Sequence, residues 1–322
     1  RGMKLGFIGL GKMGKAMVLR LLEQGVDVVV YNRTQQKLDE LSSEIQNSTL
    51  RLRSGQELKI KNSGKLYKSF ELKELVNQLE TPRVIWLMVE HGKPVDDVLD
   101  KLVAAGVTRG DVIIDGGNSF FKDSVRRYKE LKEKGIHYLD IGTSGGLLGA
   151  REGACLMIGG DKEIYERLTP LFHSLAGKKG GVAYFGPSGA GHFVKMVHNG
   201  VEYGMLQAIG EGFEILEKGP YKLNFHQVAE NWNKGSVVRG WLMELLARAL
   251  KSDPRLDTIE GVIGGGSTGE WMVETAKELN VETPVIKESL RARKKSLAKP
   301  TFSGKVVAAL RNQFGGHEMR KK

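Results

Sequence analysis

One glycine-rich segment near the amino terminus limits the number of folds that this chain can adopt. It reads Gly9-Leu10-Gly11-Lys12-Met13-Gly14. It follows residues 4–8, a short apolar stretch typical of a buried strand, and it opens residues 12–24, which have the pattern of a helix. In a strand–turn–helix unit the first glycine makes the tight turn, the second admits a pyrophosphate to the backbone, and the third lets the helix pack on the strand. The segment therefore predicts a dinucleotide site that includes Gly9, Gly11, Met13 and Gly14.

Strand and helix patterns alternate after this segment, as they do in parallel βαβ units. Strands are predicted at 4–8, 27–31, 84–89, 112–115 and 138–141, with helices at 12–24, 71–79, 94–105 and 121–134. After Pro187 only helical patterns follow, at 189–218, 225–233, 237–250, 270–279, 284–295 and 303–313. We predict an α/β Rossmann-like N-terminal domain, residues 1–186, followed by an all-α C-terminal domain with a tail, residues 187–322.

One polar and basic stretch, residues 43–67, interrupts this alternation. Four apolar residues alternate with charged ones on either side of a Ser-Gly pair, which is a pattern of strands joined by a turn. We expect either a small surface hairpin or an exposed loop without a functional role. The four apolar residues are Leu50, Leu52, Leu58 and Ile60.

Charge and cysteine content limit the partners and the compartment. The formal net charge is +11, but lysines and arginines are scattered and are not interleaved with aromatic residues, so we expect no nucleic-acid partner. A solvated basic surface or a site for small multiply charged anions accounts for the charge. The sequence contains no apolar window of about 18 residues, so we expect no membrane-spanning helix. The strand pattern starts at residue 4, which predicts no signal peptide, and the single Cys155 suits a reducing compartment, so we expect the cytoplasm.

The end of the second predicted strand, Asn32-Arg33-Thr34, bears on the choice of cofactor. An NAD site usually has Asp or Glu here to accept a hydrogen bond from the ribose 2′-hydroxyl. Asn32 does not repel a phosphate, Arg33 can pair with one and Thr34 offers a further donor, so we predict NADP in preference to NAD. If Arg33 is only a solvated loop residue, both cofactors would be used. Met88 and Val89, at the end of the strand 84–89, are assigned to the same cofactor site.

Two further glycine-rich turns follow strands of the predicted sheet. Asp115-Gly116-Gly117-Asn118-Ser119 follows the strand 112–115, and Gly142-Thr143-Ser144-Gly145-Gly146 follows the strand 138–141. Ligands of open α/β sheets bind at the carboxyl ends of the strands, and such turns offer backbone amides to an anion. Each turn alone is also compatible with an ordinary tight turn, but two in one sheet favour a shared site.

The predicted helix 189–218 carries an unusual polar stripe. Lys195, His198, Asn199, Glu202 and Tyr203 fall at i, i+3, i+4, i+7 and i+8, which is one helix face. A surface helix normally has an apolar stripe on a polar background, so this reversed pattern predicts a buried helix whose polar face meets something enclosed. A satisfied structural network is the alternative. The other positions are apolar or small: Phe193, Val194, Met196, Val197, Gly200, Val201 and Met205.

These motifs together resemble the 6-phosphogluconate dehydrogenase family over nearly the whole chain. The resemblance lies in the dinucleotide motif, Asn32-Arg33-Thr34, Gly116-Gly117-Asn118-Ser119, Ser144-Gly145-Gly146, the run from Gly191 to Gly200, and the tail. At 322 residues the chain is similar to the short form, which lacks the second helical repeat of longer enzymes.

The resemblance implies a role for each matched residue. Lys195 would be the general base and Glu202 the general acid, with His198 and Asn199 beside them in the catalytic set and in contact with substrate. Arg293 would bind the substrate phosphate, and Arg311 and His317 would reach the active site of a neighbouring subunit in a homodimer or homotetramer. The remaining substrate contacts would be Asn118, which also touches the cofactor, Ser144, Gly145, Gly146, Tyr203 and Thr268.

The implied reaction is the NADP-dependent oxidative decarboxylation of a sugar-acid phosphate, 6-phosphogluconate. A lysine can take the hydroxyl proton if burial lowers its pKa, and its ammonium can then polarise the new carbonyl while carbon dioxide leaves. Glu202 could protonate the resulting enediol. Histidines lack metal-ligand spacing, so we expect no metal.

One segment departs from the longer enzymes. Where their pattern reads Lys-Gly-Thr-Gly-Lys-Trp, this chain has Gly266 and Glu270 around Thr268, so a related sugar acid is possible. Two other functions stay open. A non-decarboxylating β-hydroxyacid dehydrogenase also has a dinucleotide motif and the Lys195–Asn199 spacing, and a catalytically silent NADP-binding regulatory protein is the alternative of another class.

Overall fold

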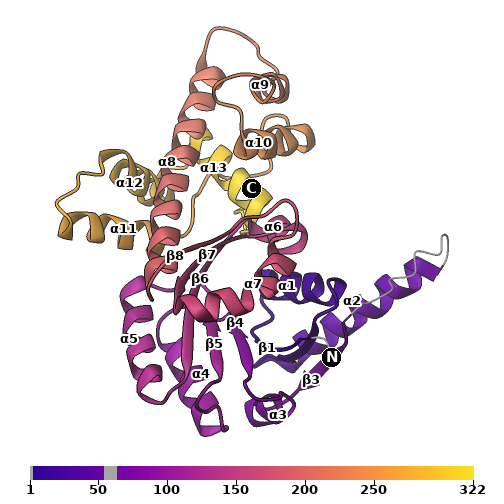
Figure 1. Ribbon diagram of the computed structural model, residues 1–322. Helices are drawn as coiled ribbons and strands as arrows, with labels where there is room; N and C mark the ends of the chain where they lie inside the picture. Colours follow the sequence, from indigo (N-terminus) through magenta and orange to yellow (C-terminus); the bar gives the residue numbers. More distant parts are fainter. Residues whose placement is uncertain (1–2, 54–63) are drawn as a thin grey trace. The chain divides into compact units, whose positions relative to one another are not determined.

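The computed structural model describes residues 3–53 and 64–322, which form two compact units, residues 1–195 and 196–322 (Figure 1). The division falls within one long helix, α8, Ala190–Lys218, whereas the domain boundary that we predict near residue 186 lies at the end of the preceding strand and stays a prediction. The predicted order of an α/β N-terminal part and an all-helical C-terminal part is confirmed.

Unit 1 is built on an eight-stranded sheet in the order β3-β2-β1-β4-β5-β6-β7-β8. All neighbours are parallel except β6 and β7, which run antiparallel. The strands are β1 Lys4–Ile8, β2 Asp27–Tyr31, β3 Leu66–Ser69, β4 Val84–Leu87, β5 Val112–Asp115, β6 His137–Ser144, β7 Cys155–Gly160 and β8 Val182–Gly186. The helices before α8 are α1 Lys12–Glu23, α2 Gln35–Arg53, α3 Leu72–Asn77, α4 Lys93–Ala104, α5 Phe121–Glu133, α6 Gly146–Glu152 and α7 Lys162–Ala176.

Both faces of this sheet are buried, which explains why its central strands are continuously apolar. Along β4, Trp86 packs into the core beneath α1 and α7, while Ile85 and Leu87 pack into the opposite core beneath α3 and α4. Successive side chains of a strand point to opposite faces, so one strand serves both layers of helices. Because β1, β4, β5 and β6 run parallel, their carboxyl ends lie at the same end of the sheet.

The hairpin prediction for residues 43–67 is wrong where the structure describes them. Residues up to Arg53 belong to α2, and Leu66–Ser69 forms β3, which pairs parallel with β2. Leu38 and Leu41 of α2 are fully buried in the core, so the helical spacing of these apolar residues outweighs the alternation further along. The rest of the predicted hairpin, residues 54–63, lies outside the described residues.

Unit 2 consists of the rest of α8 with five further helices around a separate apolar core. They are α9 Phe225–Trp232, α10 Trp241–Ser252, α11 Ser267–Glu278, α12 Pro284–Ala298 and α13 Phe302–Gly315. Gly200 and Gly210 let neighbours approach α8: a Cβ atom at Gly200 would lie 1.7 Å from the sulfur of Met272 on α11, and one at Gly210 would lie 2.7 Å from Ser303 Oγ on α13. None of the helices in the described ranges is long and apolar enough to cross a membrane.

Candidate active site

The glycine motif between β1 and α1 has the geometry of a dinucleotide loop. Gly9 has φ +102°, and a Cβ atom there would lie 2.2 Å from the carbonyl oxygen of Met88, so no other residue fits the turn. A Cβ atom at Gly14 would lie 2.1 Å from the carbonyl oxygen of Gly9, so this glycine lets α1 pack on the strand. At Gly11 no atom lies within 4 Å of such a Cβ, which leaves the backbone open to a cofactor pyrophosphate.

The end of β2 is tied to this loop through Asn32. Its Oδ1 accepts a hydrogen bond from the amide of Leu10 at 2.9 Å, and its Nδ2 donates to the carbonyl of Thr34 at 3.0 Å. Arg33 and Thr34 are exposed, and Arg33 forms no ion pair with another described residue. An unpaired guanidinium therefore follows β2 at the position where the cofactor ribose is recognised in this fold.

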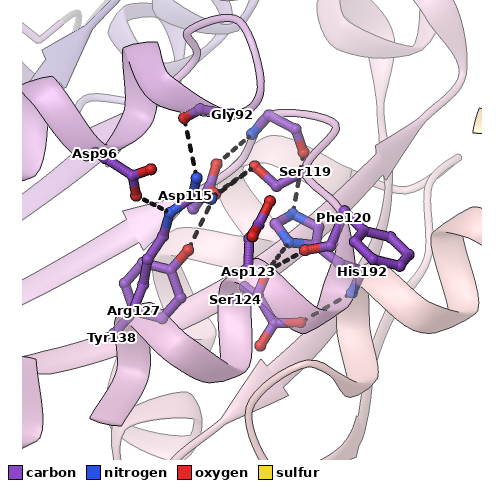
Figure 2. A network of polar contacts seen from close by, with 12 residues as sticks. Gly92, Asp96, Asp115, Ser119, Phe120, Asp123, Ser124, Arg127, Tyr138 and His192 are labelled. Atoms are coloured by element: carbon purple, nitrogen blue, oxygen red, sulfur yellow. Dashed lines mark hydrogen bonds and ion pairs between the residues drawn. The ribbon is translucent and has the colours of Figure 1, made fainter. Parts of the chain in front are cut away.

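The turn after β5 is held by a buried polar network (Figure 2). Asp115 accepts hydrogen bonds from Ser119 Oγ at 2.7 Å, from Tyr138 Oη at 3.0 Å and from the amide of Gly117 at 3.2 Å. Burial and the adjacent carboxylate of Asp115 raise the pKa of Tyr138 well above its ordinary value, so its hydroxyl stays protonated and donates. Asn118 itself is exposed, and the network fixes the turn that carries it.

Arg127 completes this network from α5. Its side chain is fully buried, and its Nε donates to Asp96 at 2.7 Å while Nη2 donates to the carbonyl of Gly92 at 3.0 Å. Its Nη1 lies 3.5 Å from Asp115 Oδ2 (Figure 2). A buried cation with two carboxylates and a carbonyl is fully compensated, so Arg127 serves the structure of the turn.

Two glycines let the backbone of α8 pack directly against strand β6. A Cβ atom at Gly142 on β6 would lie 2.3 Å from Lys195 Cβ, and one at Gly191 would lie 2.3 Å from the carbonyl oxygen of Asp140. The buried carboxylate of Asp140 accepts hydrogen bonds from the backbone amides of Gly189 at 2.7 Å and His192 at 2.8 Å. A carboxylate at a helix N-terminus satisfies orphan amides and complements the helix dipole, so it fixes where α8 begins.

Lys195 is consequently placed beside the third glycine-rich turn. The lysine is 9% exposed, and Gly142 precedes Ser144, Gly145 and Gly146 at the end of β6. Gly145 and Gly146 have φ +115° and +57°, so both turn residues adopt backbone that favours glycine. Unit 1 therefore brings together Lys195 and the start of this turn, as the sequence predicts.

In unit 2 a second group of predicted residues gathers around Tyr203. Its hydroxyl lies 3.3 Å from Thr268 Oγ1, and the guanidinium of Arg293 stacks 3.6 Å from the centre of its ring. Gly269 makes this packing possible, because a Cβ atom there would lie 2.5 Å from Tyr203 Cε2. Arg311 of α13 joins the group beside Gly265, where a Cβ atom would lie 2.9 Å from Arg311 Nη2.

Two arginines, the buried Arg293 and the half-buried Arg311, thus lie close together in unit 2. Burial lowers the pKa of Arg293 to about 10; Arg311 contributes to the lowering, whereas Tyr203 and Glu202 oppose it. Burial also lowers the pKa of Arg311, with Tyr203 and Glu202 opposing. Arg293 Nη1 donates to the carbonyl of Gly264 at 3.2 Å, but Nη2 is buried without a hydrogen-bond partner among the described residues. An anion placed there would supply the missing acceptor.

The remaining predicted residues of the helix and tail are placed as follows. His198 Nδ1 lies 3.0 Å from Asn199 Oδ1 on α8. His317 is exposed, with its ring 6.1 Å from that of Phe314. Glu270, which replaces a lysine of the longer pattern, pairs at 3.1 Å with Lys294, the neighbour of Arg293 on α12.

Three residues that shape the site were not among the predicted site residues: Arg127, Asp140 and His192. Arg127 lies in a helix rich in charged residues and Asp140 lies within a predicted strand, so neither pattern shows that the side chain is buried. His192 lies outside the polar stripe of α8. Only contacts between distant parts of the chain identify them. Across residues 3–53 and 64–322, no three His, Cys, Asp or Glu side chains are grouped so that they could hold a metal ion.

Comparison with known proteins agrees with this architecture. Residues 4–186 match the NAD binding domain of 6-phosphogluconate dehydrogenase, and residues 191–313 match the C-terminal domain of 6-phosphogluconate dehydrogenase. Such a pairing of a dinucleotide-binding sheet with a helical unit defines a class of oxidoreductases. The chain belongs to the 6-phosphogluconate dehydrogenase family.

Relatives of two lengths match the chain. Bacillus subtilis YqeC, whose name gives the 6-phosphogluconate dehydrogenase assignment as provisional, is 47% identical over 99% of this chain and 100% of its own. A Haloferax volcanii NAD-dependent, decarboxylating 6-phosphogluconate dehydrogenase is 41% identical over 99% of both chains. A longer Bacillus subtilis NADP-dependent, decarboxylating enzyme is 39% identical over 90% of this chain and 60% of its own.

A solved structure gives the same result. Plasmodium falciparum 6-phosphogluconate dehydrogenase, studied with NADP and with 6-phosphogluconate, superposes with a TM-score of 0.79 at 32% identity. It covers 92% of this chain, which spans 62% of that longer protein. Relatives of both cofactor types therefore match, and similarity alone does not choose between NAD and NADP.

Proposed function

We propose that this protein catalyses the NADP-dependent oxidative decarboxylation of 6-phospho-D-gluconate to ribulose 5-phosphate and carbon dioxide. The observation that carries the proposal is the pair formed by the buried Arg293 and the half-buried Arg311, within a chain of this family. Two desolvated guanidinium groups beside each other repel, and neither forms an ion pair with a described carboxylate. A dianionic phosphate relieves both costs, because it can accept hydrogen bonds from both groups.

The substrate contacts are proposed from the family motifs. Tyr203 and Thr268 lie beside Arg293 and would share the phosphate end. Asn118 and the turn of Ser144, Gly145 and Gly146 offer amide and hydroxyl donors suited to the carboxylate end, and His198 and Asn199 would contact the hydroxyl groups between. The family assignment supports this division, since each residue matches a motif that the family shares.

Lys195 is proposed as the general base and Glu202 as the general acid. A bound oxidised nicotinamide would supply the hydride acceptor for the substrate carbon that is oxidised. Lys195, almost completely buried beside Gly142, would take the hydroxyl proton, and its ammonium would then polarise the carbonyl as carbon dioxide leaves. Glu202 would donate a proton to the resulting enediol carbon. Both residues belong to the single helix α8, which supports their action on one substrate.

NADP is proposed in preference to NAD because of the end of β2. Asn32 brings no negative charge there, and Arg33 has an exposed guanidinium without an ion-pair partner among the described residues. A 2′-phosphate would pair with that guanidinium, whereas a 2′-hydroxyl would gain little from it. The open backbone at Gly11 fits the pyrophosphate of either cofactor.

The decisive experiment measures both products. Purified protein is incubated with 6-phosphogluconate and NADP while reduced cofactor and released carbon dioxide are measured together. We expect equal amounts of both, and much less of either with unphosphorylated gluconate or with NAD. Reduced cofactor without carbon dioxide would instead indicate a non-decarboxylating hydroxyacid dehydrogenase. Equal rates with gluconate would reject the phosphate role of the arginine pair.

A further inference from the structure

His192 occupies a place on α8 that neither the polar stripe nor the proposed reaction uses. It is 1% exposed and lies three residues before Lys195, so the two residues belong to the same turn of the helix. Its Nε2 lies 3.0 Å from the carbonyl oxygen of Gly117, and its Nδ1 lies 2.7 Å from Ser124 Oγ on α5 (Figure 2). Both ring nitrogens are therefore engaged, and they contact two different segments of the chain.

The partners determine which nitrogen carries the proton. A carbonyl oxygen only accepts, so Nε2 must donate to Gly117. The Ser124 hydroxyl has one hydrogen and two acceptors within reach, His192 Nδ1 at 2.7 Å and the carbonyl of Phe120 at 3.4 Å. The shorter contact favours donation to Nδ1, and the neutral Nε2–H form of His192 then satisfies both of its contacts. The ring thus acts as a directed link from Ser124 through His192 to Gly117.

The carbonyl of Gly117 belongs to the peptide group that leads into Asn118. The amide of Gly117 is held from the other side by Asp115, at 3.2 Å, and Asp115 is fixed by the buried network beneath it. A Cβ atom at Gly117 would also lie 2.9 Å from the carbonyl oxygen of Val89, so the turn packs closely against the end of β4. His192 supplies the one side-chain hydrogen bond to the Gly117 carbonyl within the described part of the chain.

We propose that His192 is a positioning residue that fixes Asn118 relative to Lys195, by joining the turn after β5 to the helix turn that carries the lysine. The inference rests on the proposed function for the roles of Asn118 and Lys195. Asp140 anchors the same helix turn to β6, through the amide of His192. The backbone of residue 192 is therefore fixed to one strand and its side chain to the turn after the next strand in the sheet.

Two substitutions separate the two contacts of the ring. His192→Gln places an amide nitrogen near the position of Nε2, so it keeps the donor to Gly117 and loses the contact with Ser124. His192→Asn keeps a polar group near Nδ1 and leaves the Gly117 carbonyl without its donor. Ser124→Ala is the matched control, because it removes the Nδ1 contact and leaves Nε2 in place.

We expect His192→Asn to lower kcat about 10- to 100-fold, the range that follows from small misplacements of reacting groups. The KM for the cofactor should change less than threefold. His192→Gln and Ser124→Ala should keep at least about one third of wild-type kcat, although their melting temperatures fall by amounts similar to that of His192→Asn. Equal loss of kcat in His192→Gln and His192→Asn, in step with the melting temperatures, would overturn the proposal, as would wild-type kcat in His192→Asn.

A second measurement keeps this test apart from the proposed function. Hydrogen exchange of a peptide that covers residues 116–120 needs no substrate. Exchange should accelerate at least fivefold in His192→Asn and remain near wild type in His192→Gln. Unchanged exchange in His192→Asn would overturn the link to Gly117. Failure of the wild-type protein to turn over 6-phosphogluconate would reject the proposed function and leave this structural link intact.

Discussion

Lys195 packs on Gly142 so closely that a Cβ atom on the glycine would lie 2.3 Å from the Cβ of the lysine. The distance is far below any van der Waals contact, and the Cβ of Lys195 moves only with the backbone of α8. The helix that carries the proposed base therefore depends on the absence of a side chain at one position of β6.

Gly142→Ala should displace this turn of α8 and lower kcat about 10- to 100-fold, because misplacement by about 1 Å can cost two orders of magnitude. Overpacking should also lower the free energy of unfolding by about 1–3 kcal/mol. Steady-state kinetics and thermal unfolding check both effects. Gly212→Ala, on the same helix with no atom within 4 Å of its Cβ, should keep wild-type kcat. An active, stable Gly142→Ala protein would contradict the close contact.

Lys195→Met removes the proposed base while keeping the length of the side chain. Turnover should fall about 10²- to 10⁴-fold, the usual contribution of a general acid–base group. The dissociation constant for NADP, measured by fluorescence titration, should stay within threefold. The exposed Lys179, which pairs with Glu152 on the surface, gives the control Lys179→Met with unchanged kinetics. Near-normal turnover of Lys195→Met would remove the lysine from the mechanism.

Arg33→Ala should discriminate between the two cofactors. Loss of a charge-assisted contact of about 1.5–3 kcal/mol predicts a KM for NADP that rises roughly 10- to 100-fold. The KM for NAD should change less than threefold, because no phosphate is present to lose a partner. Lys73→Ala, a surface change on α3, is the control. Equal weakening of both cofactors would mean that Arg33 does not recognise the 2′-phosphate.

Glu270→Gln tests the charge balance near Arg293. The change frees the cation of Lys294, with which Glu270 pairs at 3.1 Å on an exposed surface. Exposed pairs contribute about 0.2–1 kcal/mol, so the KM for 6-phosphogluconate should fall by no more than about fivefold. High salt should reduce the effect. Glu288→Gln, which releases Arg291 in the same way on α12, should leave this KM unchanged. A rise in KM for Glu270→Gln would contradict the expectation.

Mixed oligomers test where Arg311 acts. The structure places Arg311 with Arg293 of its own chain, whereas the family resemblance predicted a site in a neighbouring subunit. Lys195→Met and Arg311→Ala subunits can be coexpressed with different tags and the mixed species isolated. If Arg311 acts in the site of its own chain, one site of the mixed species lacks Lys195 and the other lacks Arg311. We therefore expect no recovery of turnover. Recovery towards one quarter or more of wild-type activity would assign the tail to the partner subunit.

The sequence predicted those parts of the fold that follow from local periodicity. Helices of unit 2 such as α9 and α12 lie within a few residues of their predicted ranges, because apolar spacing and flanking turn residues define them. Strands β7 and β8 were not predicted. The apolar stretch of β7 is only Leu156–Ile158 and ends in Gly159-Gly160, so it is too short to stand out as a strand in the sequence.

The roles of the candidate site residues stay predictions. Lys195 and Tyr203 were named because helix periodicity places them on one face of a helix, and Arg293 was named because of the family resemblance. Arg127 and His192 were missed because their roles depend on Asp115 and Gly117, which are remote in sequence. Burial of a polar side chain is a property of tertiary packing, and no local pattern encodes it.

The reversal of direction at β7 has a consequence for how this chain can vary. Strand β8 is parallel to β7 and therefore antiparallel to β6, so its last residue lies near the strand position of Asp140. Helix α8 starts there and runs along β6 towards Gly142. Each residue added between Gly189 and Lys195 would turn the lysine by about 100° and carry it about 1.5 Å along the axis. Substitutions in this interval can therefore be tolerated, whereas an insertion or a deletion would move Lys195 away from its position.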